Sequence, residues 1–184
     1  NRSWDIPTLS SVACDHKNGG EMVAEYFIKN KHTKIGMIEG PKGSFVSDQR
    51  IKGFKSFFKN NKNTKLYSEK GFFTYDGGFQ ASQKILQNKG VSAIFCADDT
   101  MAFGCLDYIK QNTTIKIPKD LELIGYDDIS MSHWKSYDLT TVRQPIRQMS
   151  KLVTQLVDDY IKDPDYESVK HIVQGSLIKR KTTR

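Results

Sequence analysis

Cysteine is scarce in this chain of 184 residues, and so are the features that depend on it. The three cysteines, Cys14, Cys96 and Cys105, are too few and too widely spaced for a disulfide framework. They form no C-x-x-C pair, so a zinc knuckle is not indicated. Free thiols of this kind are typical of a reducing compartment, and we therefore expect a cytoplasmic protein.

Long apolar runs are also missing. The longest are short pieces such as Ala93–Ala97, whereas a helix that spans a bilayer needs about 20 apolar residues. No signal peptide is visible, although the chain begins with Asn1 rather than methionine, which suggests a fragment or a processed chain. We expect no membrane association.

Arginine contributes only six of the 28 basic residues, which exceed the 21 acidic residues by a formal net charge of +7. Nucleic-acid sites favour clustered arginine and aromatic side chains, whereas the lysines here are scattered from Lys17 to Lys181. In the densest run, Lys52, Lys55 and Lys59 share one face of a predicted helix, opposite an apolar face. This pattern favours a solvated surface helix over a DNA-binding stripe.

The motifs of common enzyme classes are absent. Gly40–Ser44 (GPKGS) lacks the G-x-x-x-x-G-K-[ST] spacing of a phosphate loop, and neither G-x-G-x-x-G nor G-x-S-x-G occurs. The four histidines, His16, His32, His133 and His171, are dispersed. Because no nucleophile, base and oxyanion donor come together, we expect no catalysis, no cofactor and no resident metal.

What the chain does have is a regular alternation of short apolar runs with helical stretches. The predicted strands are Leu9–Cys14, Lys34–Glu39, an extended piece ending at Phe72-Phe73, Ser92–Ala97, Leu121–Tyr126, Thr140–Arg143 and one or two strands within Ser168–Leu177. Near-continuous apolar strands separated by helices are typical of parallel βαβ units. The sequence therefore predicts an α/β fold, with a parallel sheet and helices on both faces.

Local signals also predict where the helices begin and end. One is expected to open at Asn18-Gly19-Gly20, one to be capped by Ser47 or Asp48, one to run from Asp76 to Gly90, and the longest to start at Pro145. The longest helix has a predicted apolar side, formed by Ile146, Met149, Leu152, Val153, Leu156, Val157 and Tyr160.

Polar and aromatic side chains follow the predicted strands. Open α/β sheets bind ligands beyond the carboxyl ends of their strands, and the residues there are Arg50, Phe73, Asp98, Asp127 and Gln144. Carboxylates, an amide and a guanidinium bind paired hydroxyl groups, and an aromatic ring covers the apolar face of a sugar. The pattern predicts a pocket for a polyhydroxyl ligand.

Each acidic position has a structural alternative. Asp99 and Asp128 stand between a strand and a helix, where aspartate commonly caps the helix, so we expect structural roles for them. A metal-dependent α/β enzyme is a further hypothesis, because Asp98-Asp99 and Asp127-Asp128 could together bind a divalent cation.

Several motifs, in order along nearly the whole chain, resemble those of the lac-repressor (LacI/GalR) family. They are Asp15–Gly20 (DHKNGG), Ala24, Lys31–Gly36 (KHTKIG), Glu39–Pro41 (EGP), Arg50–Phe54 (RIKGF), Ala93–Gly104 (AIFCADDTMAFG), Ile117–Leu121 (IPKDL), Gly125–Asp128 (GYDD), Leu139–Pro145 (LTTVRQP) and Lys179–Thr183 (KRKTT). Two segments depart from the family pattern. Asp98 replaces the usual asparagine, and Ser136-Tyr137-Asp138 stands where a proline usually precedes the LTT motif.

The resemblance implies a two-lobed, periplasmic-binding-protein-like effector core. It implies four parts: 1–14 as the tail of an incomplete N-terminal lobe, 15–142 as the C-terminal lobe, 143–172 as a segment returning to the N-terminal lobe, and 173–184 as a crossing strand and tail. The family's DNA-binding helix-turn-helix would lie outside this chain.

The family's effector contacts fall on the strand-end residues named above, and also on Asn1 and Arg2, where sugar-binding relatives carry an Asp-Arg pair. Asp98, unlike asparagine, accepts hydrogen bonds but cannot donate them when ionised. Phe73 followed by Gly77-Gly78-Phe79 is similar to ribose-type members and favours a pentose.

The function implied by the resemblance is that of a cytoplasmic transcriptional repressor core. A small sugar effector would close the two lobes of a homodimer and so control operator DNA binding by the missing N-terminal domain. An exported sugar receptor with the same fold is the main alternative, and the free cysteines and the repressor-like LTTVRQP and KRKTT segments argue against it.

Overall fold

The computed structural model describes residues 8–58, 63–163 and 165–184, and it contains two sheets. The strands are β1 (Ser11–Cys14), β2 (Lys34–Glu39), β3 (Lys65–Lys70), β4 (Ala93–Cys96), β5 (Glu122–Asp127), β6 (Thr140–Arg143), β7 (Lys170–Val173) and β8 (Ser176–Ile178). The helices are α1 (His16–Lys29), α2 (Phe45–Ser56), α3 (Tyr75–Leu86), α4 (Asp99–Asn112), α5 (Ile146–Lys162) and one 3-10 turn, Ser130–His133.

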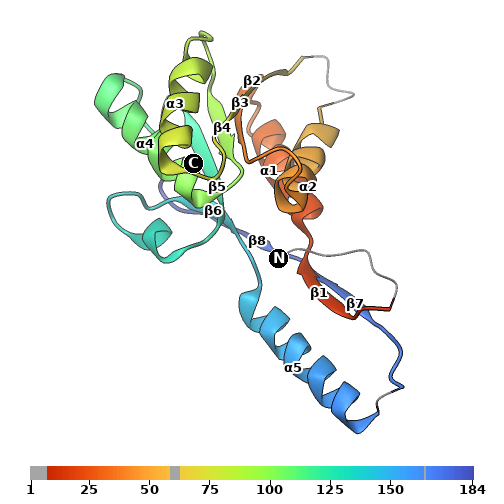
Figure 1. Cartoon of the computed structure of the whole chain (residues 1–184). Coiled ribbons are helices and arrows are strands. Elements are labelled where there is room, and N and C mark those ends of the chain that lie inside the picture. Colours follow the sequence, from red (N-terminus) through yellow and green to blue (C-terminus); the bar gives the residue numbers. More distant parts are fainter. Residues whose placement is uncertain (1–7, 59–62, 164) are drawn as a thin grey trace.

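The larger part of the molecule is built on a six-stranded sheet with the order β3-β2-β4-β5-β6-β8 (Figure 1). The first five strands pair in parallel, and only β8 runs antiparallel, against β6. Short apolar strands joined by helices give this arrangement because a parallel crossover needs a covering helix. The predicted parallel α/β fold is confirmed, and the antiparallel last strand was not predicted.

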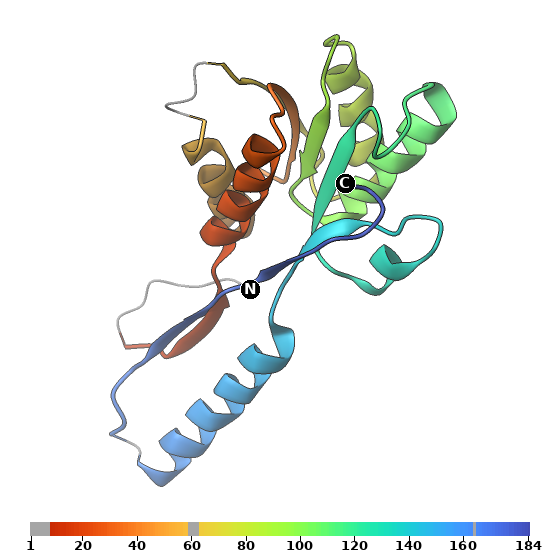
Figure 2. The same ribbon diagram turned by 180° about the vertical axis from the view of Figure 1, so that it is seen from behind.

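Helices cover both faces of this sheet: α1 and α2 lie on one face, and α3 and α4 lie on the other (Figure 2). Side chains alternate between the faces along each strand, so that Ile35 and Met37 pack under α1 and α2 while Ile38 packs under α3 and α4. In α2, Lys52 is exposed and Phe54 is fully buried, as expected of a surface helix. Lys59 lies outside the described residues.

The smaller part consists of α5 and the parallel two-stranded sheet β1-β7. Three connections join it to the larger part: β1 to α1, β6 to α5, and β7 to β8 (Figures 1 and 2). Its core among the described residues is small and includes Cys14, Met149 and Val173. Several apolar side chains predicted to lie on the packed side of α5 are instead exposed, namely Ile146, Val153 and Val157.

The ends of several elements differ from those predicted. Helix α1 begins at His16 because Asp15 caps it, accepting a hydrogen bond of 2.9 Å from the amide of Asn18. Ser44, rather than Ser47 or Asp48, stands at the N-cap of α2. Among the described residues, no helix is long and apolar enough to cross a bilayer.

The predicted C-terminal ends of two further elements also differ from those in the structure. Helix α3 stops at Leu86, short of the predicted Gly90. Strand β3 ends at Lys70, and the chain turns sharply afterwards, because Phe72 and Phe73 both take left-handed backbone conformations, with φ of 57° and 59°.

Candidate functional site

Arg50 is the central residue of the site at the carboxyl ends of the strands. It projects from α2, and its guanidinium donates from Nη2 to Oδ1 of Asp127 at 2.7 Å and from Nη1 to the carbonyl of Ala97 at 2.5 Å. The guanidinium carbon also lies 3.7 Å from the centre of the Tyr126 ring. Only 3% of Arg50 is exposed, so its position is set by these partners.

Asp127 ends β5 and receives a second donor. Nε2 of Gln144 donates to the same Oδ1 at 2.7 Å, so that Asp127 joins α2 to the segment between β6 and α5. Its side chain remains 25% exposed, and Asp127 and Gln144 border a cavity of about 760 Å³. Asp127 has a φ of 114°, a strained conformation for a residue with a side chain, and such strain concentrates at functional sites.

Asp98 follows β4, the strand next to β5, and is the N-cap of α4. Its Oδ1 accepts a hydrogen bond of 2.8 Å from the amide of Met101. Burial raises the pKa of Asp98 to about 6; the Met101 amide lowers it, the charge of Asp127 raises it and that of Arg50 lowers it. Asp98 is therefore poised to change charge near neutral pH.

Phe73 follows β3, the edge strand of the sheet, which pairs with β2. Its half-buried ring occupies the space beside Gly40, directly after β2, since a Cβ on that glycine would lie 2.3 Å from the ring. The structure therefore joins Arg50, Asp127 and Gln144 through hydrogen bonds and places Asp98 close enough for the charges of Arg50 and Asp127 to shift its pKa. Phe73 lies beside Gly40 and is not among the residues that line the cavity at Asp127 and Gln144. Asn1 and Arg2 lie outside the described residues.

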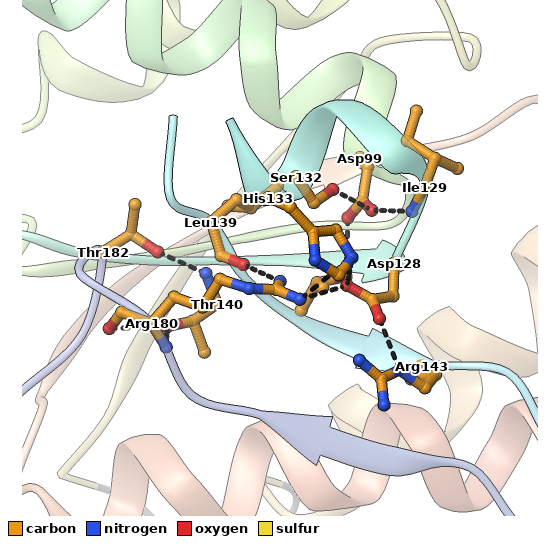
Figure 3. Close-up of polar contacts among 11 residues, drawn as sticks. Asp99, Asp128, Ile129, Ser132, His133, Leu139, Thr140, Arg143, Arg180 and Thr182 are labelled. Atoms are coloured by element: carbon orange, nitrogen blue, oxygen red, sulfur yellow. Dashed lines mark hydrogen bonds and ion pairs between the residues drawn. The ribbon is translucent and has the colours of Figure 1, made fainter. Parts of the chain in front are cut away.

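The carboxylates of Asp99 and Asp128 both accept hydrogen bonds from other residues of the protein, as Figure 3 shows. Asp99 accepts hydrogen bonds from the hydroxyl groups of Ser132 and Thr141 and from the amide of Ile129. Burial raises its pKa to about 7 although these donors favour the charged form. Its role is structural, as expected, but it does not cap α4, because Asp98 does.

Asp128 is surrounded by basic side chains. Arg180 donates to Oδ1 at 2.6 Å, Arg143 donates to Oδ2 at 2.5 Å, and His133 lies 3.4 Å from Oδ1 (Figure 3). Arg143 is the last residue of β6, and Arg180 follows β8, so Asp128 joins the end of β6 to the C-terminal tail. It is therefore an ion-pair anchor and does not cap a helix.

These contacts weigh against the metal hypothesis. Two of the four aspartates that it needs, Asp99 and Asp128, already have protein donors on both carboxylate oxygens. Within the part of the chain that the structure describes, no group of three histidine, cysteine or acidic side chains is arranged to hold a metal ion.

Two site residues were missed from the sequence. Tyr126 lies within β5, not beyond its end, and its ring packs against the guanidinium of Arg50. His16 is the first residue of α1, and its Nδ1 lies 3.4 Å from Nε of Arg50. The capping aspartate at position 15 was the available signal, because it places residue 16 at the start of a helix after a strand.

A lobe with polar groups at the carboxyl ends of its parallel strands, joined by three connections to a second, partial lobe, is the architecture of a periplasmic-binding-protein-like receptor domain. The family model described as "Periplasmic binding protein-like domain" matches residues 24–183. The chain belongs to this family, and the resemblance to LacI-type regulators is confirmed.

Relatives with similar sequences are transcriptional repressors. The chain is 32% identical over 187 residues to the probable HTH-type transcriptional repressor ExuR of Bacillus subtilis (strain 168), covering 100% of this chain and 56% of the relative. It is 33% identical over 172 residues to the HTH-type transcriptional repressor PurR of Vibrio vulnificus (strain CMCP6), covering 91% and 51%. The chain thus spans about half the length of these curated relatives.

Solved structures agree with this assignment. A LacI family transcriptional regulator from Enterococcus faecalis V583 with bound ribose superposes with a TM-score of 0.88 at 27% identity, covering 98% of this chain and 66% of that one. The transcriptional regulator CelR in complex with cellobiose superposes with a TM-score of 0.85 at 26% identity, covering 96% and 54%.

Proposed function

We propose that this chain is the effector-binding core of a cytoplasmic DNA-binding transcriptional repressor and has no enzymatic activity. The observation that carries the proposal is the cluster in which Arg50 and Gln144 both donate to Asp127, at the edge of a cavity. A carboxylate held by two donors, with a quarter of its side chain exposed, retains lone pairs for ligand hydroxyl groups.

The side chains at the carboxyl ends of the strands suit a sugar as the effector. Asp98, Asp127 and Gln144 offer acceptors and donors for neighbouring hydroxyl groups, and Phe73 offers a half-buried ring for an apolar sugar face. Two structural relatives bind ribose and cellobiose, and the phenylalanine and double glycine that favour a pentose make ribose the first ligand to test.

The four parts predicted from the sequence describe how the site would be completed. Residues 1–14 and 143–172 would belong to an N-terminal lobe, residues 15–142 to the C-terminal lobe, and residues 173–184 to the crossing strand and tail. The exposed apolar side chains of α5 would pack against the rest of the N-terminal lobe, which would also bring Asn1 and Arg2 toward the ligand. Operator DNA would be bound by a helix-turn-helix outside this chain, in a homodimer.

A ligand panel tests this proposal. Thermal unfolding of the intact protein is measured with pentoses, hexoses, sugar phosphates, purines and divalent metals. A ligand at about 100 times its dissociation constant adds roughly 2.7 kcal/mol of stability. We expect a shift with one sugar that is lost in Asp127→Ala and kept in the matched control Asp120→Ala, an exposed aspartate away from the site. Stabilisation by a metal alone would refute the proposal and favour the enzyme.

The regulatory part needs the whole regulator and its operator. We expect Arg50→Ala or Asp127→Ala to abolish the response of DNA binding to ligand while leaving operator affinity unchanged, since the proposed DNA-binding element is a separate domain outside this chain. A variant that still responded normally to ligand would show that the pocket is wrongly assigned.

A further inference from the structure

His16 is a buried histidine whose ring lies between the first turn of α1 and Arg50. Only 2% of the residue is exposed. Its Nδ1 lies 3.4 Å from Nε of Arg50, and its ring is tilted against Tyr126 with the two centroids 5.9 Å apart. It therefore contacts the same two residues that form the centre of the site.

The hydrogen bonds of Arg50 show what His16 contributes. A guanidinium has five N–H groups. Asp127 accepts one from Nη2 and the carbonyl of Ala97 accepts one from Nη1, which leaves the single Nε–H for His16. A planar group that is held at all three nitrogens cannot rotate about its own axis, and two N–H groups remain for a ligand.

The contact fixes the protonation state of His16. Nε of Arg50 is only a donor, so Nδ1 of His16 must present a lone pair and the ring proton must sit on Nε2. Burial and, secondly, the charge of Arg50 lower the pKa of His16 to about 3. The charged or titratable groups that face this pair include Asp127 and Tyr126 from β5, Cys14 from β1 and Asp98, which follows β4. Nε2 itself has no hydrogen-bond partner among the described residues.

We propose that His16, as the neutral Nε2–H tautomer, is a positioning residue that fixes the guanidinium plane of Arg50 by accepting its Nε–H. The inference rests on the proposed function, because Arg50 is taken to contact the effector. Without this acceptor, Arg50 keeps its two other partners but can pivot about them, which disturbs the two N–H groups left for the ligand.

Nuclear magnetic resonance tests the contact directly on the intact, ¹⁵N-labelled protein. In the wild type, we expect long-range ¹⁵N correlations to identify His16 as the Nε2–H tautomer from pH 7.5 to 5. We expect a slowly exchanging Nε–H signal for Arg50. In His16→Phe the exchange of this proton should become at least tenfold faster. In His16→Gln it should return toward the wild-type rate, because the amide oxygen can accept the same bond.

The control is His171→Phe, the same change in a β7 residue, which should leave the Arg50 signal unchanged. A His16 ring that titrates near 6.5, an Nδ1–H tautomer, or equal Arg50 exchange in the wild type and His16→Phe would each overturn the proposal. The tautomer and titration of His16 in the wild type test the proposal even if His16→Phe fails to fold.

Titration with D-ribose separates this proposal from the proposed function. We expect the affinity to fall about tenfold in His16→Phe and to recover in His16→Gln, with both variants folded. If ribose does not bind the wild type, the pentose assignment fails while the Arg50 signal still decides the role of His16. Equal ribose affinity in wild type and His16→Phe would overturn the positioning role.

Discussion

Arg180 lies 52 residues after Asp128 in the sequence, yet it donates a hydrogen bond of 2.6 Å from Nη2 to Oδ1 of that aspartate. Only 3% of the Asp128 side chain is exposed, and Arg143 occupies its other oxygen. Burial alone would raise the pKa of Asp128, but the hydrogen bonds from Arg143 and Arg180 outweigh it and hold the pKa below its usual value.

Asp128→Asn should therefore destabilise the protein by about 3 kcal/mol at pH 7, because it removes one partner from an enclosed ion pair. A lowered folded-state pKa means that this stabilisation is present above about pH 4 and is lost as the pH falls through the folded value. Urea unfolding at pH 7 and pH 3 should show a large difference between wild type and variant at pH 7 and a smaller one at pH 3. Asp138→Asn, which removes the exposed pair with Lys181, serves as the control and should change stability by less than about 0.5 kcal/mol.

Asp98→Asn should change the pH dependence of stability in the opposite sense. The pKa of Asp98 is raised to about 6, so the folded state binds this proton more tightly than the unfolded state does. Stability from this group is therefore greatest below about pH 4 and falls by up to roughly 3 kcal/mol as the pH rises through 6. Asparagine still caps α4 but does not titrate. The free energy of unfolding of the variant should therefore rise relative to that of the wild type between pH 4 and 7. A constant difference, like that expected for the exposed Asp76→Asn, would contradict the buried titration.

Arg50→Met should cost roughly 3 kcal/mol of stability, because the carboxyl group of Asp127, at a strained strand end, would lose its guanidinium partner. The double variant Arg50→Met/Asp127→Asn should cost less than the sum of the two single changes. Chemical denaturation of all four proteins measures this coupling. Additive effects would show that the two side chains do not interact in solution, and Asp48→Ala on the same helix should be nearly neutral.

Gly53→Ala should test how closely α1 and α2 approach. A Cβ at this position would lie 1.9 Å from the carbonyl oxygen of Lys17, so the two helices would have to separate. We expect a loss of more than about 2 kcal/mol in unfolding free energy, against less than about 0.5 kcal/mol for the exposed neighbour Lys52→Ala. Since Arg50 lies on the same helix, the alanine variant should also weaken ligand binding.

The positions of Asp98 and Asp127 at one edge of the sheet could be predicted because they depend on a local rule. Asp98 and Asp127 directly follow apolar strands, and parallel strands bring their carboxyl ends to one edge of the sheet. The chemistry of each residue was harder to predict. Which aspartate of each pair faces inward depends on the backbone turn, and the left-handed φ of Asp127 and Asp128 has no signature in the sequence.

Contacts between distant segments were not predictable. The partners of Asp128 come from β6 and from the tail, and nothing in the chemistry of Arg143 or Arg180 distinguishes them from surface cations. The direction of β8 could not be predicted for a similar reason, since a strand of three residues carries no signal for parallel or antiparallel pairing.

The position of the last strands has a consequence for synthesis of the protein. β1 pairs with β7 through Ser11 and Lys170, and the edge of β6 is completed by β8. At roughly 5–20 residues per second, a ribosome needs on the order of 8–30 s to add the intervening chain. During that interval the edge of β1 that is later covered by β7 offers unpaired backbone groups to other chains. Slow translation should therefore lengthen the exposure of this strand and lower the yield of folded protein.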